Sequence, residues 1–331
     1  MDTKRDFANW RELLGWLIKN PQEKKRLAQE ADVKPITLKR WVDGESLPRE
    51  ENLLHLANVL PADFSSAFLQ LAEEEFPFLT RERVEHGQVA QEIPSELYAQ
   101  ALQIYAKTPP SLARQHLQKI ILENAIDHLD PGKQGLAIHL MCCVPARDGQ
   151  KIRALRQISG IGNSPWERDQ DRKTLFVGAE SVAGNAVMNY RMVWIDSRED
   201  VSFTPVNWGA HEQSAVAAPI LRQARIAGSL LAASNRPHYF GEGHKALLEL
   251  YAQLVTLLFS PAEFYDHADI QLGVMPEVDR QEPYFRDIEQ RVTRRVTEAQ
   301  ASQREITSQT ARIQVWQDIV DELLQLPGKA D

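Results

Sequence analysis

Residues 214–258 read SAVAAPILRQARIAGSLLAASNRPHYFGEGHKALLELYAQLVTLL. Two short apolar runs, 214–221 and 225–233, are separated by only three residues, which is the spacing of a β-hairpin. A helix is predicted to follow over 242–259, because its apolar residues recur three and four positions apart: Leu247, Leu250, Tyr251, Leu254, Val255 and Leu258. The stretch therefore predicts an antiparallel pair of strands with a helix packed against it.

The chain before this stretch continues the same pattern. A helix is predicted over 95–128, with an interruption at Pro109 and Pro110. Apolar runs of strand length then lie at 136–144, 152–158 and 192–195. We therefore expect an antiparallel sheet with flanking helices in the middle of the chain.

The first 79 residues have apolar residues at helical spacing throughout. Pro21, Pro48 and Pro61 stand where one short helix must end or the next begin, because proline lacks an amide hydrogen and fixes its own φ. This predicts a bundle of about five helices. The polar stretch 80–94 that follows is interpreted as a linker.

The tail, 283–326, contains no glycine, and its apolar residues are mostly three, four or seven positions apart. This spacing is typical of a long helix that needs a partner, so we expect the tail to help the protein dimerise. The predicted domains are a helical bundle (1–79), a linker (80–94), a helical lead-in with the sheet domain (95–265) and a C-terminal extension with the long helix (266–331).

Composition limits the class of protein. With 331 residues, 43% of them hydrophobic and 25% charged, the chain is long enough for two domains and is unlike a disordered or fibrous protein. A net charge of -8 excludes a uniformly basic surface but permits a local one. No apolar run is long enough to span a membrane and the first residues do not resemble a signal peptide, so we expect a cytoplasmic protein.

The two cysteines, Cys142 and Cys143, are adjacent in a predicted strand. Neighbouring residues of a strand point to opposite faces, so we interpret both as packing residues and not as a disulfide. No further spacing of histidine and cysteine supports a metal site, and nothing in the sequence names a cofactor.

A first motif lies at residues 26–48, RLAQEADVKPITLKRWVDGESLP. It resembles the helix-turn-helix of the phage repressor and Cro-like family. Leu27 and Ala28 match the inner face of the first helix, Leu38 and Trp41 match the core of the second, and Gly44 matches its end. Two residues depart from the family pattern: Asp32, where the turn usually has glycine, and Pro35, which is tolerated in the first turn of a helix.

The resemblance implies that the second helix enters the major groove of double-stranded DNA while its surroundings contact phosphates. Between residues 19 and 40 there are seven basic and three acidic residues, a local charge of +4 in an acidic chain. The expected phosphate contacts are Lys24, Lys34 and Lys39. The expected base-edge contacts are Ile36, Thr37 and Arg40, and Pro35 lies in the interface without a hydrogen to donate.

A second motif begins with VGAESVAGNAVMNYRMVWIDS at 177–197 and continues into the hairpin and helix of 214–258. The order of Gly184, Asp196, Pro219, Gly228 and Phe240 resembles the GAF domain family. The resemblance implies a sheet with helices on one face and a pocket on the other, which holds a small ligand or contacts a partner.

Six residues of the predicted loops and crossing helix are candidates for lining this pocket: Arg153, Trp166, Tyr190, Trp194, Trp208 and His211. Tryptophan and tyrosine combine an apolar face with one hydrogen-bond donor, which suits planar ligands. For any single ring of this set, an ordinary role in the core is the simpler interpretation.

The sequence has no nucleophile elbow, phosphate-binding loop or dinucleotide fingerprint, and we expect that it is not an enzyme. The fold class expected is α plus α/β: a five-helix helix-turn-helix bundle, a central GAF-like antiparallel sheet with flanking helices, and a long C-terminal helix. The predicted function is a DNA-binding, ligand-sensing transcription regulator that forms a homodimer. The alternative is a protein-interaction module whose helix-turn-helix bundle does not bind DNA, and the two differ in whether DNA affinity falls steeply with salt.

Overall fold

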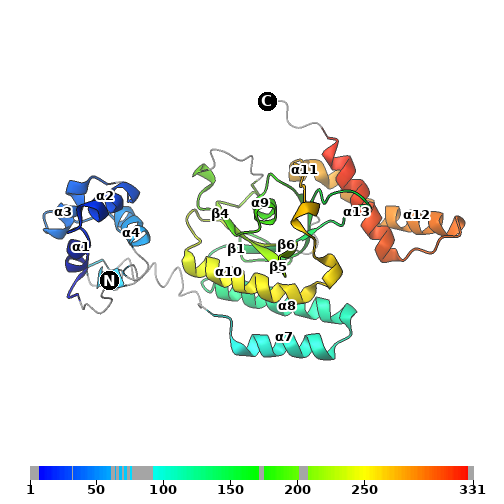
Figure 1. Cartoon of the computed structure of the whole chain (residues 1–331), viewed down its shortest axis with the longest axis horizontal. Coiled ribbons are helices and arrows are strands. Elements are labelled where there is room, and N and C mark those ends of the chain that lie inside the picture. The colour runs from blue at the N-terminus through cyan, green and yellow to red at the C-terminus, as the bar shows by residue number, and fades with distance from the viewer. Residues whose placement is uncertain are drawn as a thin grey trace. The chain divides into compact units, whose positions relative to one another are not determined.

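The structure is a computed structural model that describes residues 7–31, 33–60, 92–170, 175–200 and 208–326, together with single residues between 64 and 76 (Figure 1). The chain divides into two compact units, Met1–Gly87 and Gln88–Asp331. Most of the predicted linker, 80–91, lies outside the described residues. Each unit is considered by itself.

The N-terminal unit contains four helices whose bounds are described: α1 (Trp10–Leu17), α2 (Pro21–Glu30), α3 (Pro35–Val42) and α4 (Glu50–Val59). Asn9 and Asn20 cap α1 and α2, because each side chain accepts a hydrogen bond from the first turn. The predicted fifth helix falls on residues 61–79, which are mostly outside the described part of the chain. The helices share one apolar core, formed by Trp10, Leu13, Leu14, Leu27, Leu38, Trp41, Leu53 and their neighbours.

The end of α3 follows the predicted pattern. Gly44 has a φ of +76°, in the left-handed region that glycine adopts readily. The amides of Gly44 and Glu45 donate to the carbonyls of Trp41 and Arg40, which closes the last turn of the helix. Asp32, the unusual turn residue, lies outside the described residues.

The second unit is built on a six-stranded sheet in the order β3-β2-β1-β6-β5-β4, and every neighbouring pair is antiparallel. The strands are β1 (Leu136–Cys143), β2 (Leu155–Gly162), β3 (Phe176–Val177), β4 (Val193–Ile195), β5 (Ser214–Arg222) and β6 (Arg225–Ser234). The predicted hairpin is β5–β6. Gln223 and Ala224 both have positive φ, as a tight two-residue hairpin turn requires.

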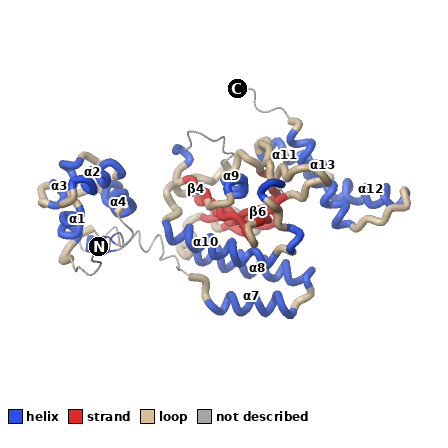
Figure 2. The backbone as a smooth tube through the Cα atoms, viewed as in Figure 1, coloured by secondary structure: helices blue, strands red, loops and turns tan. Residues whose placement is uncertain are grey.

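Two helices cover one face of this sheet, α8 (Pro110–Leu129) and α10 (Glu242–Val255), and α7 (Ser95–Lys107) packs on the far side of α8 (Figure 2). Alternate residues of the central strands, such as Ile138, Leu140 and Leu230, point into the core between the sheet and α8 and α10. The opposite face carries α9 (Val182–Asn189) and α11 (Val278–Gln281). The predicted antiparallel sheet with flanking helices is confirmed.

The tail differs from the single long helix that we expected. It forms two helices, α12 (Ile288–Ala301) and α13 (Ser308–Leu324), which run antiparallel because Arg291 pairs with Glu322 at 2.9 Å while Arg295, one turn later in α12, pairs with Asp318, one turn earlier in α13. Gln303 has a left-handed φ of 56°, and this residue reverses the chain. The heptad-like spacing therefore describes two helices that pair with each other.

The apolar face of α13 is covered by its own chain. Val315, Ile319 and Leu323 are buried in one cluster with Ala154 and Phe176 of the sheet unit. The guanidinium of Arg156 also lies over the ring of Trp316, 3.7 Å from its centre. The tail therefore packs against the sheet unit and shares a buried cluster with it.

Cys142 and Cys143 are both buried and belong to different clusters, one on each face of β1. Burial raises the pKa of Cys142 to about 12 and that of Cys143 further. Among the described residues no helix is both long enough and apolar enough to cross a membrane.

Candidate functional site

A cavity of about 690 Å³ lies on the sheet face opposite α8 and α10. Its floor is the sheet, where His139 and Met141 of β1, Gln157 of β2, Ala215 of β5 and Leu231 of β6 point into it. These residues share one face because side chains alternate along a strand, and His139 is directly opposite Leu231 in the β1–β6 pair. The cavity therefore has walls from several elements, as small-ligand sites do.

A glycine in the neighbouring strand makes room for the imidazole in the floor. A Cβ atom on Gly160 of β2 would lie 2.9 Å from Nδ1 of His139 and 2.8 Å from the Cβ of Gln170. Both distances are shorter than a normal contact, so only glycine fits between the two side chains. This close contact explains why residue 160 is a glycine.

One wall is the start of α9. Ser181 caps this helix by accepting from the amide of Gly184 at 2.9 Å. The carboxylate of Glu180 accepts from the amides of Gly178 and Met275, each at 2.8 Å, and thereby joins α9 to the segment that precedes α11. A Cβ on Gly184 would lie 1.8 Å from the carbonyl oxygen of Gly178, which explains the glycine that marks this motif.

A second wall carries the aromatic residues. Trp166 and His211 meet edge to face, with ring centres 5.9 Å apart, and Trp208 lies beside them in the lining. Glu212 accepts from the amide of Gly209 at 2.8 Å, and burial raises the pKa of this carboxyl despite the charge of Arg198 nearby.

The remaining wall comes from the C-terminal extension. Gln281 of α11 is 1% exposed, accepts from the amide of Phe176 and donates to the carbonyls of Phe176 and Pro276. Phe285 packs on Phe176, with ring centres 5.8 Å apart. Sequence reasoning missed this wall, because the segment is distant in sequence and has no motif of its own.

The charged residues of the lining have one sign. Glu180, Glu212, Asp279 and Glu282 line the cavity, and none of the described lining residues is a lysine or an arginine. Two histidines, His139 and His211, and three glutamines, Gln157, Gln170 and Gln281, complete the polar set. A ligand with hydrogen-bond donors or a positive charge therefore suits this cavity better than an anion.

The structure brings three of the six predicted pocket residues to the cavity, namely Trp166, Trp208 and His211. Tyr190 lies elsewhere: its hydroxyl donates to the carbonyl of Tyr265 at 3.3 Å, and burial raises its pKa to about 12. Trp194 is 47% exposed on edge strand β4 with Lys245 over its ring, and Arg153 is exposed in a shallow groove beside α13. These three do not line the cavity, because Tyr190 follows the end of α9, Trp194 lies on an edge strand and Arg153 lies in the loop before β2.

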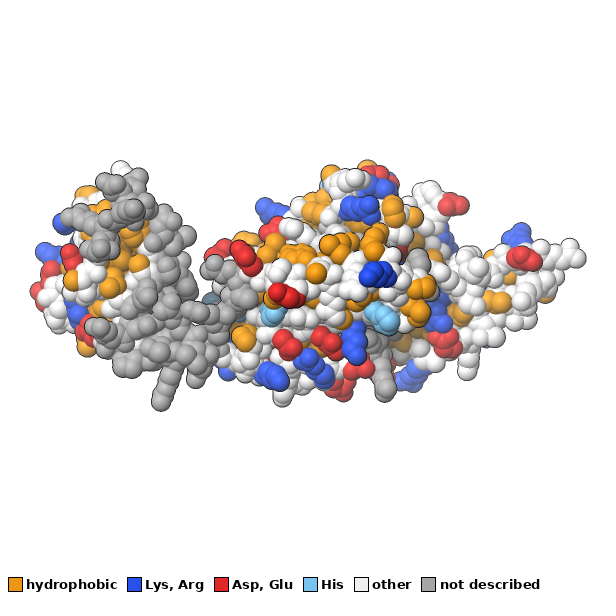
Figure 3. All heavy atoms as spheres, turned by 90° about the horizontal axis from the view of Figure 1, so that it is seen from below, with side chains coloured by type: hydrophobic (Ala, Val, Ile, Leu, Met, Phe, Trp, Pro, Cys, Tyr) orange, Lys and Arg blue, Asp and Glu red, His pale blue; other side chains and the backbone are white. Residues whose placement is uncertain are grey.

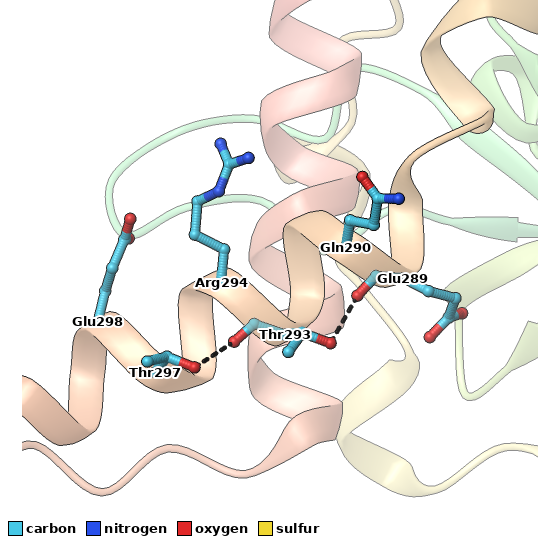
Figure 4. Close-up of a pocket in the computed structure, with 6 residues that line it drawn as sticks. All are labelled: Glu289, Gln290, Thr293, Arg294, Thr297 and Glu298. Carbon is cyan, nitrogen blue, oxygen red and sulfur yellow. Dashed lines mark hydrogen bonds between the residues drawn. The ribbon is translucent and has the colours of Figure 1, made fainter.

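Another hollow lies along the outer side of α12 (Figure 4). All six of its lining residues come from this one helix, and two of them, Thr293 and Thr297, donate back to carbonyls of the preceding turn. Among the described residues, those that form it provide one wall only, so it is not a candidate ligand site.

The N-terminal unit presents the second candidate site, the outer face of α3. Leu38 and Trp41 are 0% and 2% exposed, whereas Ile36 is 53% exposed, and Lys39 and Arg40 also face solvent. Lys34 and Pro35 are exposed at the start of the helix, Thr37 is half-buried, and Lys24 is half-buried on α2. The seven residues predicted to contact DNA thus lie on or beside one helix.

Ion pairs modify the local charge. Arg26 pairs with Glu23 and Glu30 of its own helix, each at 2.5 Å, and these contacts satisfy both acidic residues of α2. Among the described residues, Lys24, Lys34 and Lys39 form no ion pair, and Arg40 has only a distant, exposed partner in Glu45 at 3.7 Å. Their charges therefore remain available to a ligand.

No family model and no curated protein matches the chain. Three solved structures to which the second unit is similar are a type II free methionine-R-sulfoxide reductase from Thermoplasma acidophilum, a free methionine-R-sulfoxide reductase from Staphylococcus aureus, and the GAF domain of an Acinetobacter phosphoenolpyruvate-protein phosphotransferase. Identities are 13%, 15% and 12%, and TM-scores are 0.34, 0.33 and 0.34. The alignments cover 46%, 50% and 50% of this chain and 98%, 97% and 93% of the other chains. The third of these structures is a GAF domain, the family that the second motif resembles in sequence.

These structures correct one expectation. We expected from the missing catalytic motifs that the protein is not an enzyme, and that exclusion is wrong, because two of the three similar structures are reductases. The physical reason is that an active site in such a fold is assembled from separate loops around a pocket, and no contiguous motif needs to mark it.

Proposed function

We propose that the protein is a sequence-specific DNA-binding transcription regulator of the cytoplasm, and that its GAF-like unit binds a small ligand that adjusts DNA affinity. The observation that carries the proposal is the division of α3 into a buried face, with Leu38 and Trp41, and an outward face, with Ile36, Lys39 and Arg40. The major groove of DNA admits a helix of this kind.

Each outward residue has a distinct role in this proposal. Arg40 donates two hydrogen bonds to one guanine, and the methyl groups of Ile36 contact a thymine methyl. Lys24, Lys34 and Lys39 bind phosphates, which sets the position of the helix without reading sequence. Thr37 contacts a base edge, and Pro35 contributes shape alone because it has no amide hydrogen.

A homodimer is part of the proposal. One helix reads too few base pairs for high specificity, and two half-sites separated by one helical turn, about 34 Å, provide more. A ligand can change the affinity of such a dimer only if it binds two arrangements of the protein with different affinities.

The proposed ligand is a planar molecule that carries an amine or other hydrogen-bond donors. Trp166 and Trp208 offer ring surfaces, and the four carboxyl groups of the lining attract positive charge. The wall formed by α11 and residues 282–285 leads directly into α12, so a ligand in contact with Gln281 or Phe285 acts on the C-terminal extension.

DNA binding is tested with the full chain and sites selected from a random-sequence library. We expect a binding constant that falls steeply between about 50 and 200 mM salt, and Lys39→Ala should reduce the slope of log K against log salt by about 1. Arg40→Ala should cost about 1 to 3 kcal/mol and relax the preference at one base.

Arg294→Ala on α12 is the matched control and should change neither quantity. A complete lack of DNA affinity at low salt would make the DNA part of the proposal wrong and favour a bundle that docks to a protein.

The ligand class is tested separately, with two probes that share a ring and differ in charge. Tryptamine should raise the unfolding temperature of the protein, whereas indole-3-acetate should not, because its carboxylate meets the acidic lining. Equal effects of the two probes, or an effect of the acid alone, would contradict the proposed ligand chemistry while leaving DNA binding untouched.

A further inference from the structure

Two glutamines that line the cavity are almost completely buried. Gln157 of β2 is 6% exposed, and Gln170, in the loop that follows β2, is 2% exposed. Backbone hydrogen bonds hold both residues in place. The amide of Gln170 donates to the carbonyl of Gly160 at 3.1 Å, and the amide of Gln157 donates to the carbonyl of Leu175 at 2.8 Å. Both side chains therefore start from backbone that is fixed beside the floor of the cavity.

The hydrogen bonds of the two side chains determine which atom of each amide is the acceptor. Nε2 of Gln157 donates to the backbone carbonyl of Gln170 at 3.1 Å, and Nε2 of Gln170 donates to that of Glu167 at 2.7 Å. Only the nitrogen of a carboxamide can donate, so an exchange of oxygen and nitrogen would break these bonds. Among the described residues, none donates to Oε1 of Gln157 or of Gln170. Two carbonyl oxygens are therefore left as acceptors in the lining.

Both side chains lie next to Gly160. A Cβ atom on this glycine would lie 2.8 Å from the Cβ of Gln170 and 3.2 Å from Nε2 of Gln157. Gly160 thus makes room for the two glutamines as well as for the imidazole of His139. Trp166 precedes Gln170 in the same loop and also lines the cavity. One part of the cavity therefore combines two neutral acceptors with the surface of an aromatic ring.

The carboxyl groups of the lining are placed differently. Both oxygens of Glu180 already accept hydrogen bonds from backbone amides, and Asp279 and Glu282 are exposed. Glu212 belongs to the wall formed by residues 208–212. The buried acceptors beside Gly160 are therefore uncharged. Burial of a positive charge against uncharged acceptors costs more free energy than burial of a neutral N–H group, so this part of the cavity suits a neutral donor.

We infer that Gln157 and Gln170 select the ligand by accepting hydrogen bonds from one uncharged, planar NH2 group that is conjugated with its ring system. The group has two hydrogens, one for each oxygen. A methyl group in its place displaces the water that would bind the two oxygens and leaves both without a donor. The inference rests on the proposed function in one respect, which is that the cavity holds a planar ligand.

The first test compares two probes by isothermal titration of the full chain. Indole-3-carboxamide and 3-acetylindole share the indole ring and a carbonyl group, and neither is charged. They differ only in an NH2 group, which is a methyl group in the second probe. The carboxamide should bind about tenfold more tightly, because the methyl group loses two hydrogen bonds to buried acceptors.

Variants of Gln157 test whether its oxygen recognises the probe. In Gln157→Met the preference for the carboxamide should fall to about threefold, because one of the two acceptors remains. The affinity for 3-acetylindole should stay at the wild-type value, whereas a purely structural role of Gln157 would weaken both probes alike. Gln157→Glu should keep the full preference. A buried carboxyl group is neutral, so its hydroxyl donates to the carbonyl of Gln170 while its other oxygen still accepts.

The matched control is Gln253→Met, at an exposed glutamine of α10. None of the described lining residues belongs to α7, α8 or α10, which lie on the side of this unit that Figure 3 shows. The control should therefore leave the affinities for both probes unchanged.

Three results would overturn the inference. They are equal binding of the two probes to the wild type, an undiminished preference in Gln157→Met, and a Gln157→Met variant that loses affinity for both probes alike. The first result needs no variant, so the inference can fail even if a variant does not fold. If tryptamine binds while the two neutral probes bind equally, the inference fails and the proposed ligand site stands. If none of the three probes binds, the inference fails together with the ligand part of the proposed function.

Discussion

The outer face of α3 and the cavity of the second unit are built in opposite ways. The first is a convex surface whose residues all lie between 24 and 40, and its free charges are positive. The second is concave, its lining residues extend from His139 to Phe285, and its charged residues are acidic. Which residues form the surface of a helix depends on their spacing along the chain. Which residues line a cavity depends on which elements, distant in sequence, pack together.

The two sites also differ in the kind of ligand that their charges and shapes suit. Positive charge on α3 and on the neighbouring α2 suits a polyanion whose groove admits a helix. An enclosed space with aromatic rings and carboxyl groups suits a small molecule with donors. One chain thus presents two surfaces whose charged residues have opposite sign.

The largest expected effect is the loss of the α3 surface through destabilisation of the N-terminal unit, while the cavity of the second unit stays intact. Trp41 is buried beneath α3, and Trp41→Ala should destabilise the N-terminal unit by about 3 to 5 kcal/mol, because the change leaves a large cavity. Differential scanning calorimetry should show an earlier transition for this unit and an unchanged transition for the other. Ile36→Ala, on the exposed face of the same helix, is the control. A shift of both transitions would mean that the two units do not unfold separately.

The next effect acts on the cavity alone. Gly160→Ala places a methyl group against His139 and Gln170, and overpacking of this kind costs about 1 to 3 kcal/mol. The transition of the second unit should move to lower temperature while DNA affinity stays at the wild-type value. Gly243→Ala, where a Cβ would meet nothing within 4 Å, provides the control. Equal behaviour of the two variants would contradict the close contact.

A smaller effect distinguishes two tryptophans, the half-buried Trp208 and the exposed Trp194. Trp208 lines the cavity and Trp194 does not. Trp208→Ala should reduce the affinity for tryptamine by about 0.5 to 1.5 kcal/mol, the contribution of one aromatic contact, and Trp194→Ala should have no effect. Isothermal titration measures both. A loss in Trp194→Ala alone would place the ligand at another surface.

The smallest expected effect is on pH dependence. Burial raises the pKa of Glu212 in the folded chain, so the folded state binds a proton more tightly than the unfolded state. The stability contributed by this proton is complete below the ordinary pKa of 4.5 and is lost as the pH rises through the raised value. Glu212→Gln retains an oxygen for the amide of Gly209 and should flatten this slope in unfolding measurements at pH 4 to 7. If stability depends on pH as steeply in Glu212→Gln as in the wild type, the dependence belongs to another titrating group.

Local patterns predicted much of the fold. The hairpin of β5 and β6 follows from two apolar runs with a short polar separation, and the end of α3 follows from Gly44, which adopts the left-handed φ that a helix end uses. These features depend on neighbours in the chain, which a sequence displays directly. The break of the tail into two helices was not predicted, because Gln303 is not a residue that normally marks a chain reversal.

The residues of the two candidate sites also divide into those that local spacing predicts and those that only the fold brings together. The amino-acid sequence by itself determined that Ile36, Lys39 and Arg40 face outward while Leu38 and Trp41 face inward, since a helix of 3.6 residues per turn leaves no other arrangement of that pattern. It also singled out Trp166, Trp208 and His211, but only together with three residues that lie elsewhere. The tertiary structure alone decided that Glu180, Gln281 and Phe285 close the same cavity, because their meeting depends on the packing of α9 and α11 against the sheet and on no spacing along the chain.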